Sequence, residues 1–191
     1  MLHALADAGE QVLDLEGLAC HFGSAFGNLD RHAQPTSEHF RNLLAEALKG
    51  LDSGRRIWVE NESRKIGNVH LPEPFYKRMI ACPALEMLRS MDDRVAHLVD
   101  MYGDYDTGLL REAFTAIRAE LGGAQTEEAI AALEDGDLAT AARIALAYYD
   151  RTYEHGLQKR AGDNRHPVDA QGLSFAECAR QLVGAADRMG L

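Results

Sequence analysis

Two short apolar segments that each run into acidic residues constrain this fold most strongly. Residues 11–17 read QVLDLEG and residues 55–63 read RRIWVENES. Each segment is short, apolar and bounded by glycine or polar residues, as in the buried strands of a parallel sheet. We therefore predict strands at residues 11–16 and 56–60, with carboxylates at or just after their C-terminal ends.

The stretch between the two predicted strands has the apolar spacing of one amphipathic helix. Its apolar residues recur from Phe40 to Leu51, and Thr36 or Ser37 can cap its start. Strand, helix and strand in this order predict a right-handed crossover within a parallel sheet. Ligands of such sheets bind beyond the C-terminal ends of the strands. The carboxylates that we expect there are Asp14, Glu16, Glu60 and Glu62.

The rest of the chain adds one strand and then becomes mostly helical. The elements expected are a short helix at 72–80, a strand at 84–88, helices beginning at Thr126 and Asp137, a loop at 161–173 and a final helix capped by Ser174 with Glu177. The predicted fold class is α/β, with a parallel sheet and a helical C-terminal half. We expect two parts, an α/β core at residues 1–90 and a helical portion at 91–191.

Charge is distributed unevenly along a chain whose composition is otherwise ordinary. Hydrophobic residues make up 46% and charged residues 26% of 191 residues, and the net charge is −10. Residues 55–80 hold six cationic and three acidic side chains. Residues 92–140 hold three cationic and twelve acidic side chains. An acidic protein is a poor general binder of nucleic acid, but the basic segment leaves room for a phosphate-bearing partner. The residues expected to contact RNA are Arg64, Lys65, Lys77 and Arg78.

Several classes of protein are disfavoured by motifs that the sequence lacks. No run of about 18 apolar residues is present, and the first residues do not read as a secretory signal. The three cysteines and eight histidines have no metal-binding spacing, so we expect reduced thiols, no metal site, no membrane contact and a cytoplasmic location. The sequence G-x-x-x-x-G-K-[ST] is also absent, so a complete P-loop enzyme is not expected.

The candidate ligand site combines the strand ends with the loop HFGSAFG at residues 21–27. Exposed backbone N–H groups of such a loop can hold an anion, although a plain connection is an equal alternative. Glu60 and Glu62 resemble the second acidic motif of P-loop NTPases, or they only pair with neighbouring Arg and Lys residues. The predicted ligand- and phosphate-binding residues are Asp14, Glu16, His21, Gly23, Ser24, Glu60, Glu62, Arg64 and Lys65. No catalytic residue is assigned.

Three blocks in order carry a family resemblance. They are VLDLEGLACHFGSAFG, QPTSEHFRNLL and RIWVENESRKIGNVHLPEPFYKRM, and YYDRTYEHGLQKR follows later. Together they closely resemble the C-terminal domain of bacterial tRNA 2-selenouridine synthase, up to about Arg160. One departure is Phe22, because the family usually has H-R-G-S where this chain has His21-Phe22-Gly23-Ser24. A missing arginine would weaken a phosphate contact in that loop.

The resemblance implies a transferase that replaces sulfur by selenium at position 2 of the wobble uridine of tRNA. Selenophosphate donates the selenium, and geranylated 2-thiouridine, made from geranyl diphosphate, is an intermediate. The family joins a rhodanese-like domain, which carries the reactive cysteine, to a P-loop domain. This chain resembles a P-loop core without its first strand and phosphate loop, and without the rhodanese-like domain. Because that strand lies in the middle of the sheet, its neighbours would have unpaired edges.

Two functional interpretations follow from this resemblance. In the first, the chain is the C-terminal part of a selenium transferase, binds its substrate or diphosphate, and by itself incorporates no selenium into tRNA. In the second, it is a non-catalytic module that binds nucleotide or tRNA, either truncated or acting with a separate rhodanese-like subunit.

Overall fold

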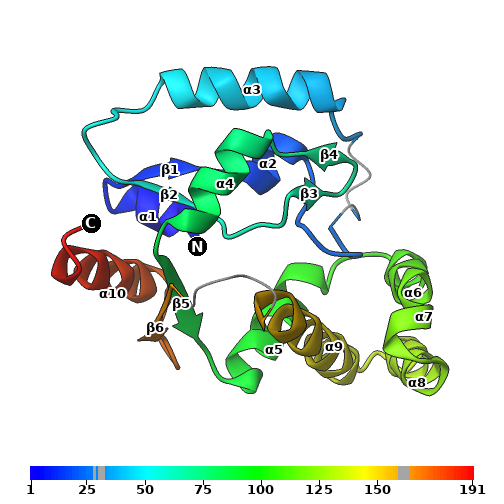
Figure 1. Cartoon of the computed structure of the whole chain (residues 1–191). Helices are drawn as coiled ribbons and strands as arrows, with labels where there is room; N and C mark the ends of the chain where they lie inside the picture. Colours follow the sequence, from blue (N-terminus) through cyan, green and yellow to red (C-terminus); the bar gives the residue numbers. More distant parts are fainter. Residues whose placement is uncertain (28, 30–32, 159–163) are drawn as a thin grey trace. The chain divides into compact units, whose positions relative to one another are not determined.

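The computed structural model describes residues 1–27, 29, 33–158 and 164–191 (Figure 1). It divides the chain into two compact units, residues 1–88 with 164–191, and residues 89–163. The boundary after residue 88 is close to the division expected after residue 90, but residues 164–191 lie with the first unit rather than with the helical portion. The predicted α/β class, with short parallel strands and a mostly helical later half, is confirmed.

The predicted crossover forms the start of the first unit. After α1 (Leu2–Asp7), β1 (Gln11–Leu13) and β2 (Ile57–Val59) pair in parallel, and α3 (Ser37–Lys49) connects them. The Thr36 hydroxyl caps α3 by accepting a hydrogen bond from the His39 N–H at 3.1 Å. The strand, helix and strand predicted from periodicity are therefore present, and both strands are shorter than expected.

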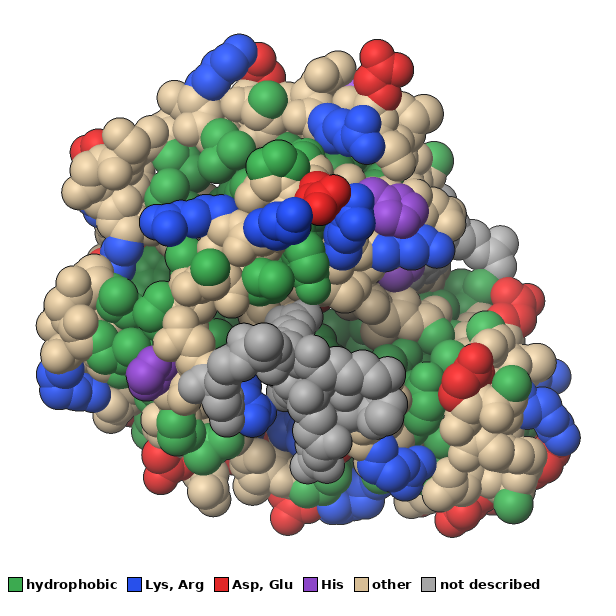
Figure 2. All heavy atoms as spheres, in the orientation of Figure 1, with side chains coloured by type: hydrophobic (Ala, Val, Ile, Leu, Met, Phe, Trp, Pro, Cys, Tyr) green, Lys and Arg blue, Asp and Glu red, His purple; other side chains and the backbone are tan. Residues whose placement is uncertain are grey.

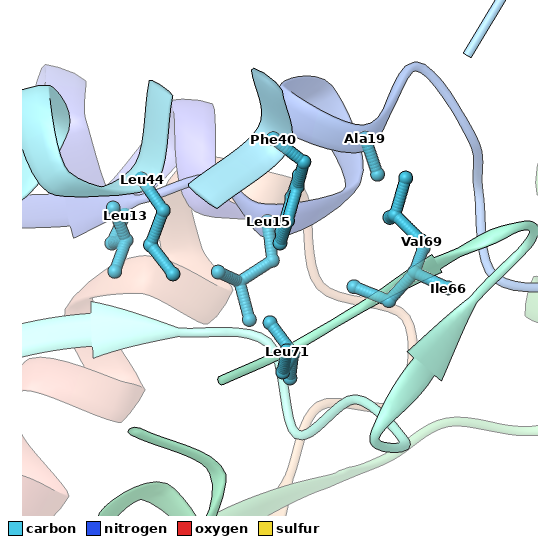
Figure 3. Packing of buried hydrophobic residues seen from close by; sticks show 8 residues of the cluster. All are labelled: Leu13, Leu15, Ala19, Phe40, Leu44, Ile66, Val69 and Leu71. Atoms are coloured by element: carbon cyan, nitrogen blue, oxygen red, sulfur yellow. The ribbon is translucent and has the colours of Figure 1, made fainter. Parts of the chain in front are cut away.

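The two faces of β1 pack on different apolar clusters, because neighbouring residues of a strand point to opposite sides. Leu13 packs in a cluster with Phe40 and Leu44 of α3, to which Leu15, Ala19, Ile66, Val69 and Leu71 also belong (Figure 3). Val12 and Trp58 pack instead on a cluster formed by α1, the C-terminal helix and Val168. The short sheet is thus held between two layers of helices.

A second parallel pair corrects the predicted sheet. The strand expected at 84–88 is present as β5 (Ala84–Leu88), but it pairs with β6 (Arg165–Asp169) and not with β2. The loop expected at 161–173 was wrong over these five residues. Pro167 is compatible with a strand here because β6 has one neighbour within the described part of the chain, which leaves a free edge for a residue without an N–H. In the same described part, β2 and β5 also pair on one side only.

A hairpin and two helices also belong to the first unit. A hairpin of β3 (Lys65–Ile66) and β4 (Val69–His70) leads into α4 (Glu73–Ala81), which occupies the stretch predicted as a short helix. The predicted final helix is α10 (Phe175–Arg188), and it buries Cys178 and Leu182. Its capping box is confirmed, because Ser174 and Glu177 bond to each other's backbone N–H.

The second unit consists of five helices within the described residues. They are α5 (Met91–Tyr102), α6 (Thr107–Ala116), α7 (Arg118–Leu121), α8 (Gly123–Glu134) and α9 (Leu138–Gln158). The expected cap at Thr126 was wrong: this residue lies inside α8, fully buried, and its hydroxyl donates to the Gly122 carbonyl at 2.9 Å. Asp137 does cap α9, accepting from the Thr140 N–H at 3.0 Å. A two-bond ion pair between Arg94 and Asp150 joins α5 to α9.

Removing the α10 cap is expected to destabilise the first unit. In Ser174→Ala, the Glu177 N–H loses its acceptor, which typically costs about 1 kcal/mol. Urea unfolding followed by circular dichroism measures this loss, with Ser53→Ala in an exposed turn as the matched control. Equal stability of the two variants would mean that α10 contributes little to the fold through its cap.

Candidate functional site

The first candidate carboxylates lie on a helix start instead of a strand end. The strand predicted at 11–16 stops at Leu13, and Asp14 caps the short helix α2 (Leu15–Ala19) by accepting from the Gly17 N–H at 2.6 Å. Glu16 therefore lies in the first turn of α2, which corrects its expected place on a strand. A Cβ atom at Gly17 would lie 2.5 Å from the Asp14 carboxylate, so a larger residue there would displace the capping side chain.

The four predicted carboxylates nevertheless converge. Glu60 follows β2 directly, and its carboxylate accepts from the Leu15 N–H at 3.0 Å, which ties the end of β2 to the start of α2. Asp14 also lies near enough to Glu60 to raise its pKa, and Glu62 and Glu60 lie near enough to Glu16 to raise its pKa. Glu62 is only 9% exposed. We call Asp14, Glu16, Glu60 and Glu62 the carboxylate cluster.

Burial and mutual repulsion raise two pKa values in this cluster. Burial, reinforced by the charges of Glu62, Glu60 and Asp14, raises the pKa of Glu16 to about 8. Burial also raises the pKa of Glu60 to about 7, reinforced by Asp14 and opposed by the hydrogen bond from the Leu15 N–H. The cluster therefore holds protons at neutral pH and can exchange them there.

The loop at 21–27 lies against the cluster through His21 and Gly23. Gly23 has φ +69°, and a Cβ atom on it would lie 2.8 Å from a Glu62 carboxylate oxygen, so only glycine fits. The Gly23 N–H donates to His21 Nδ1 at 3.0 Å. Burial lowers the pKa of His21, and Glu62 opposes this shift. The neutral imidazole consequently carries its proton on Nε2.

The same loop uses most of its N–H groups internally. The Phe22 N–H donates to the Gly27 carbonyl at 3.1 Å, and the Gly27 N–H donates to the Ser24 carbonyl at 2.9 Å. The Phe26 N–H donates to the Ser24 hydroxyl at 3.2 Å. An anion would have to open these bonds and approach buried carboxylates. The geometry therefore favours proton chemistry at the carboxylate cluster over phosphate binding by the loop.

Arg64 and Lys65 were expected to face the carboxylates, but the ion pair described for Arg64 is with a residue of α4. Its guanidinium lies 3.9 Å from Glu73, which also pairs with Lys77 at 2.8 Å. Lys65 is exposed on β3. The contacts thus bring His21 and Gly23 to the carboxylate cluster and place Arg64 and Lys65 on an exposed surface.

Gln34 supports the site and was not found from the sequence. Its amide Nε2 donates to the Ala19 carbonyl at 2.9 Å and to the Ile66 carbonyl at 3.2 Å, while Oε1 accepts from the Asn68 N–H at 2.7 Å. These bonds fasten the end of α2 to the β3–β4 turn. They join residues 15 to 34 positions apart, so no local pattern predicts them.

The described residues also bear on metal, cavity and membrane sites. Within the described residues, no group of three or more His, Cys, Asp or Glu side chains is arranged to hold a metal ion. A cavity of about 400 Å³ is lined by β6 and α10, including Asp169, Gln181 and Arg188. None of the helices described is long and apolar enough to cross a membrane.

Comparison with known proteins gives one family. The family model for the tRNA 2-selenouridine synthase AAA domain matches residues 1–174. A protein of Shewanella pealeana named tRNA 2-selenouridine synthase is 31% identical over 183 residues, covering 80% of this chain and 50% of that protein. A Cupriavidus pinatubonensis protein of the same name is 34% identical over 186 residues, covering 78% of this chain and 49% of that protein. The chain thus spans about half the length of the curated relatives it matches. No solved structure matches.

Proposed function

This chain belongs to the family of tRNA 2-selenouridine synthase AAA domains, and we propose that it is the proton-transfer and substrate-binding part of a selenium transferase. The enzyme would replace sulfur by selenium at position 2 of the wobble uridine of tRNA, in the cytoplasm. Support comes from the names of the relatives, of which the chain covers about half.

The observation that carries this proposal is the convergence of the carboxylate cluster. Its members come from the DLEG and ENES blocks, which are separated by more than 40 residues, yet Glu60 bonds to the backbone of α2. Two of the four carboxyls have pKa values raised to about 7 and 8. A group with a pKa near the working pH is suited to accept or donate a proton during a reaction.

We assign this proton chemistry to the geranylation step. The sulfur of 2-thiouridine forms a bond to the first carbon of geranyl diphosphate, while that carbon's bond to the diphosphate oxygen breaks. The uridine N3 then gives up its proton, and Glu60 is the proposed acceptor. Glu16, whose pKa is the higher of the two, would keep its proton. Selenophosphate is the proposed selenium donor for the following step.

A chimera tests the proposal. Residues 1–174 replace the matching half of the Shewanella pealeana protein, in a bacterium whose own tRNA 2-selenouridine synthase gene is deleted. Mass spectrometry of tRNA nucleosides is expected to detect geranylated 2-thiouridine and 2-selenouridine. The isolated 191-residue chain, given selenophosphate and a thiolated tRNA, is expected to form no 2-selenouridine.

Two results would contradict the proposal. The first is 2-selenouridine formed by the isolated chain. The second is a chimera that folds, as judged by thermal melting, and binds tRNA without forming either modified nucleoside. That second result would favour the alternative of a binding module without turnover.

A further inference from the structure

The β3–β4 hairpin and α4 present an exposed group of basic side chains. Arg64, Lys65, Lys77 and Arg78 are all exposed, and we call these four residues the basic face. In Figure 2, Lys and Arg side chains form a row across the part of the molecule where Figure 1 places α4 and the hairpin. The protein as a whole carries a net charge of −10, whereas this face is locally positive.

The scaffold under the basic face is fixed. Ile66, Val69 and Leu71 are each at most 1% exposed, and they anchor the hairpin in the apolar cluster around Phe40. The Leu71 N–H donates to the Arg64 carbonyl at 2.9 Å. The backbone that carries the cations is therefore held in place without a ligand, and binding would need to order only the side chains.

The basic face is only weakly neutralised from within. Residues 63–81 contain one acid, Glu73, against four cations. Glu73 pairs with Lys77 and lies near Arg64, and these side chains are 53–70% exposed. Exposed pairs of this kind contribute little and exchange readily with other anions. The hydrogen bond from Lys77 lowers the pKa of Glu73, so the carboxylate stays charged and the face keeps an excess of three positive charges.

We propose that the basic face binds the phosphate backbone of tRNA. That the RNA is a tRNA rests on the proposed function. An extended polyanion suits cations spread over a hairpin and a helix, because each cation can neutralise a different phosphate. The second unit repels the same backbone, since residues 92–140 hold twelve acids against three arginines. The RNA therefore approaches the first unit, which also carries the carboxylate cluster.

The test uses the whole chain and an unmodified tRNA transcript. Fluorescence anisotropy measures the dissociation constant between 50 and 200 mM salt for the wild type and for R64Q/K65Q/K77Q/R78Q. Removing one cation that binds a phosphate flattens the slope of log affinity against log salt by roughly 0.7–0.9. The slope of the quadruple variant should therefore be shallower by about 3. Over this salt range, the affinity of the wild type would fall about 60-fold more than that of the variant.

The matched control is R111Q/R118Q/R143Q/R151Q, which removes the same charge from exposed positions of the second unit. Its slope should equal that of the wild type. An equally flattened slope in both variants, or an unchanged slope in a folded basic-face variant, would overturn the proposal. Both variants leave the carboxylate cluster unchanged, so these salt slopes do not test the proposed function. The proposed function is tested separately by the nucleosides that the chimera forms.

Discussion

Glu60→Gln in the chimera is expected to lower the rate of geranylation by about 100-fold or more, the usual loss when a positioned proton acceptor is removed. Glutamine has almost the same shape, and its Oε1 can still accept from the Leu15 N–H that Glu60 binds at 3.0 Å. The variant therefore removes the ionisable group and keeps the link between β2 and α2. Single-turnover formation of geranylated tRNA, measured from pH 6 to 9, gives the rate.

The pH profile separates a proton acceptor from a structural role. With a pKa of Glu60 near 7, the wild-type rate should rise as the pH passes through this value, because only the ionised carboxylate can take the proton. The Glu60→Gln variant should lose that rise. Glu46→Gln, on the exposed side of α3, is the control and should retain both the rate and the profile. A Glu60→Gln enzyme with the wild-type profile would show that Glu60 accepts no proton.

The meeting of the carboxylates could be predicted because it depends on a general property of parallel strands. β1 and β2 were identified from short apolar runs, and their C-terminal ends lie side by side in any parallel pair. Asp14 and Glu60 were thus placed correctly relative to each other. Glu16 lies there for a different reason: Asp14 and Glu16 alternate with Leu13 and Leu15 as in a strand, and this alternation concealed the helix cap at Asp14.

Features that depend on distant partners were not predictable in this way. β6 contains Pro167 and polar neighbours, which are typical of a loop, and it is a strand only because β5 offers an edge. Arg64 and Lys65 follow the ENES block closely, yet the turn into β3 takes them to the surface beside α4. Gln34 acts through bonds to residues that are adjacent only after folding.

Stability should also depend on pH, because the Glu10–Arg56 pair and the carboxylate cluster affect it in opposite directions. The guanidinium of Arg56 lowers the pKa of Glu10 to about 2, so this pair stabilises the fold above the ordinary pKa of 4.5 and is lost as the pH falls toward 2. Glu16 and Glu60 have raised pKa values. Their protonated forms favour the folded state, and this stability is lost as the pH rises through about 7 and 8. Stability is therefore expected to be greatest near pH 5.

Glu16→Gln is accordingly expected to stabilise the first unit at pH 8 and to change it little at pH 5. One pKa unit corresponds to about 1.4 kcal/mol, and partial exposure of Glu16 screens the repulsion, so we expect a gain of about 2 kcal/mol at pH 8. The glutamine amide is uncharged, so it is not repelled by the other carboxylates of the cluster. Glu38→Gln is the matched control, because Glu38 is exposed at the same position of α3. Urea unfolding at both pH values measures the effect, and a Glu16→Gln variant no more stable at pH 8 than Glu38→Gln would refute the raised pKa.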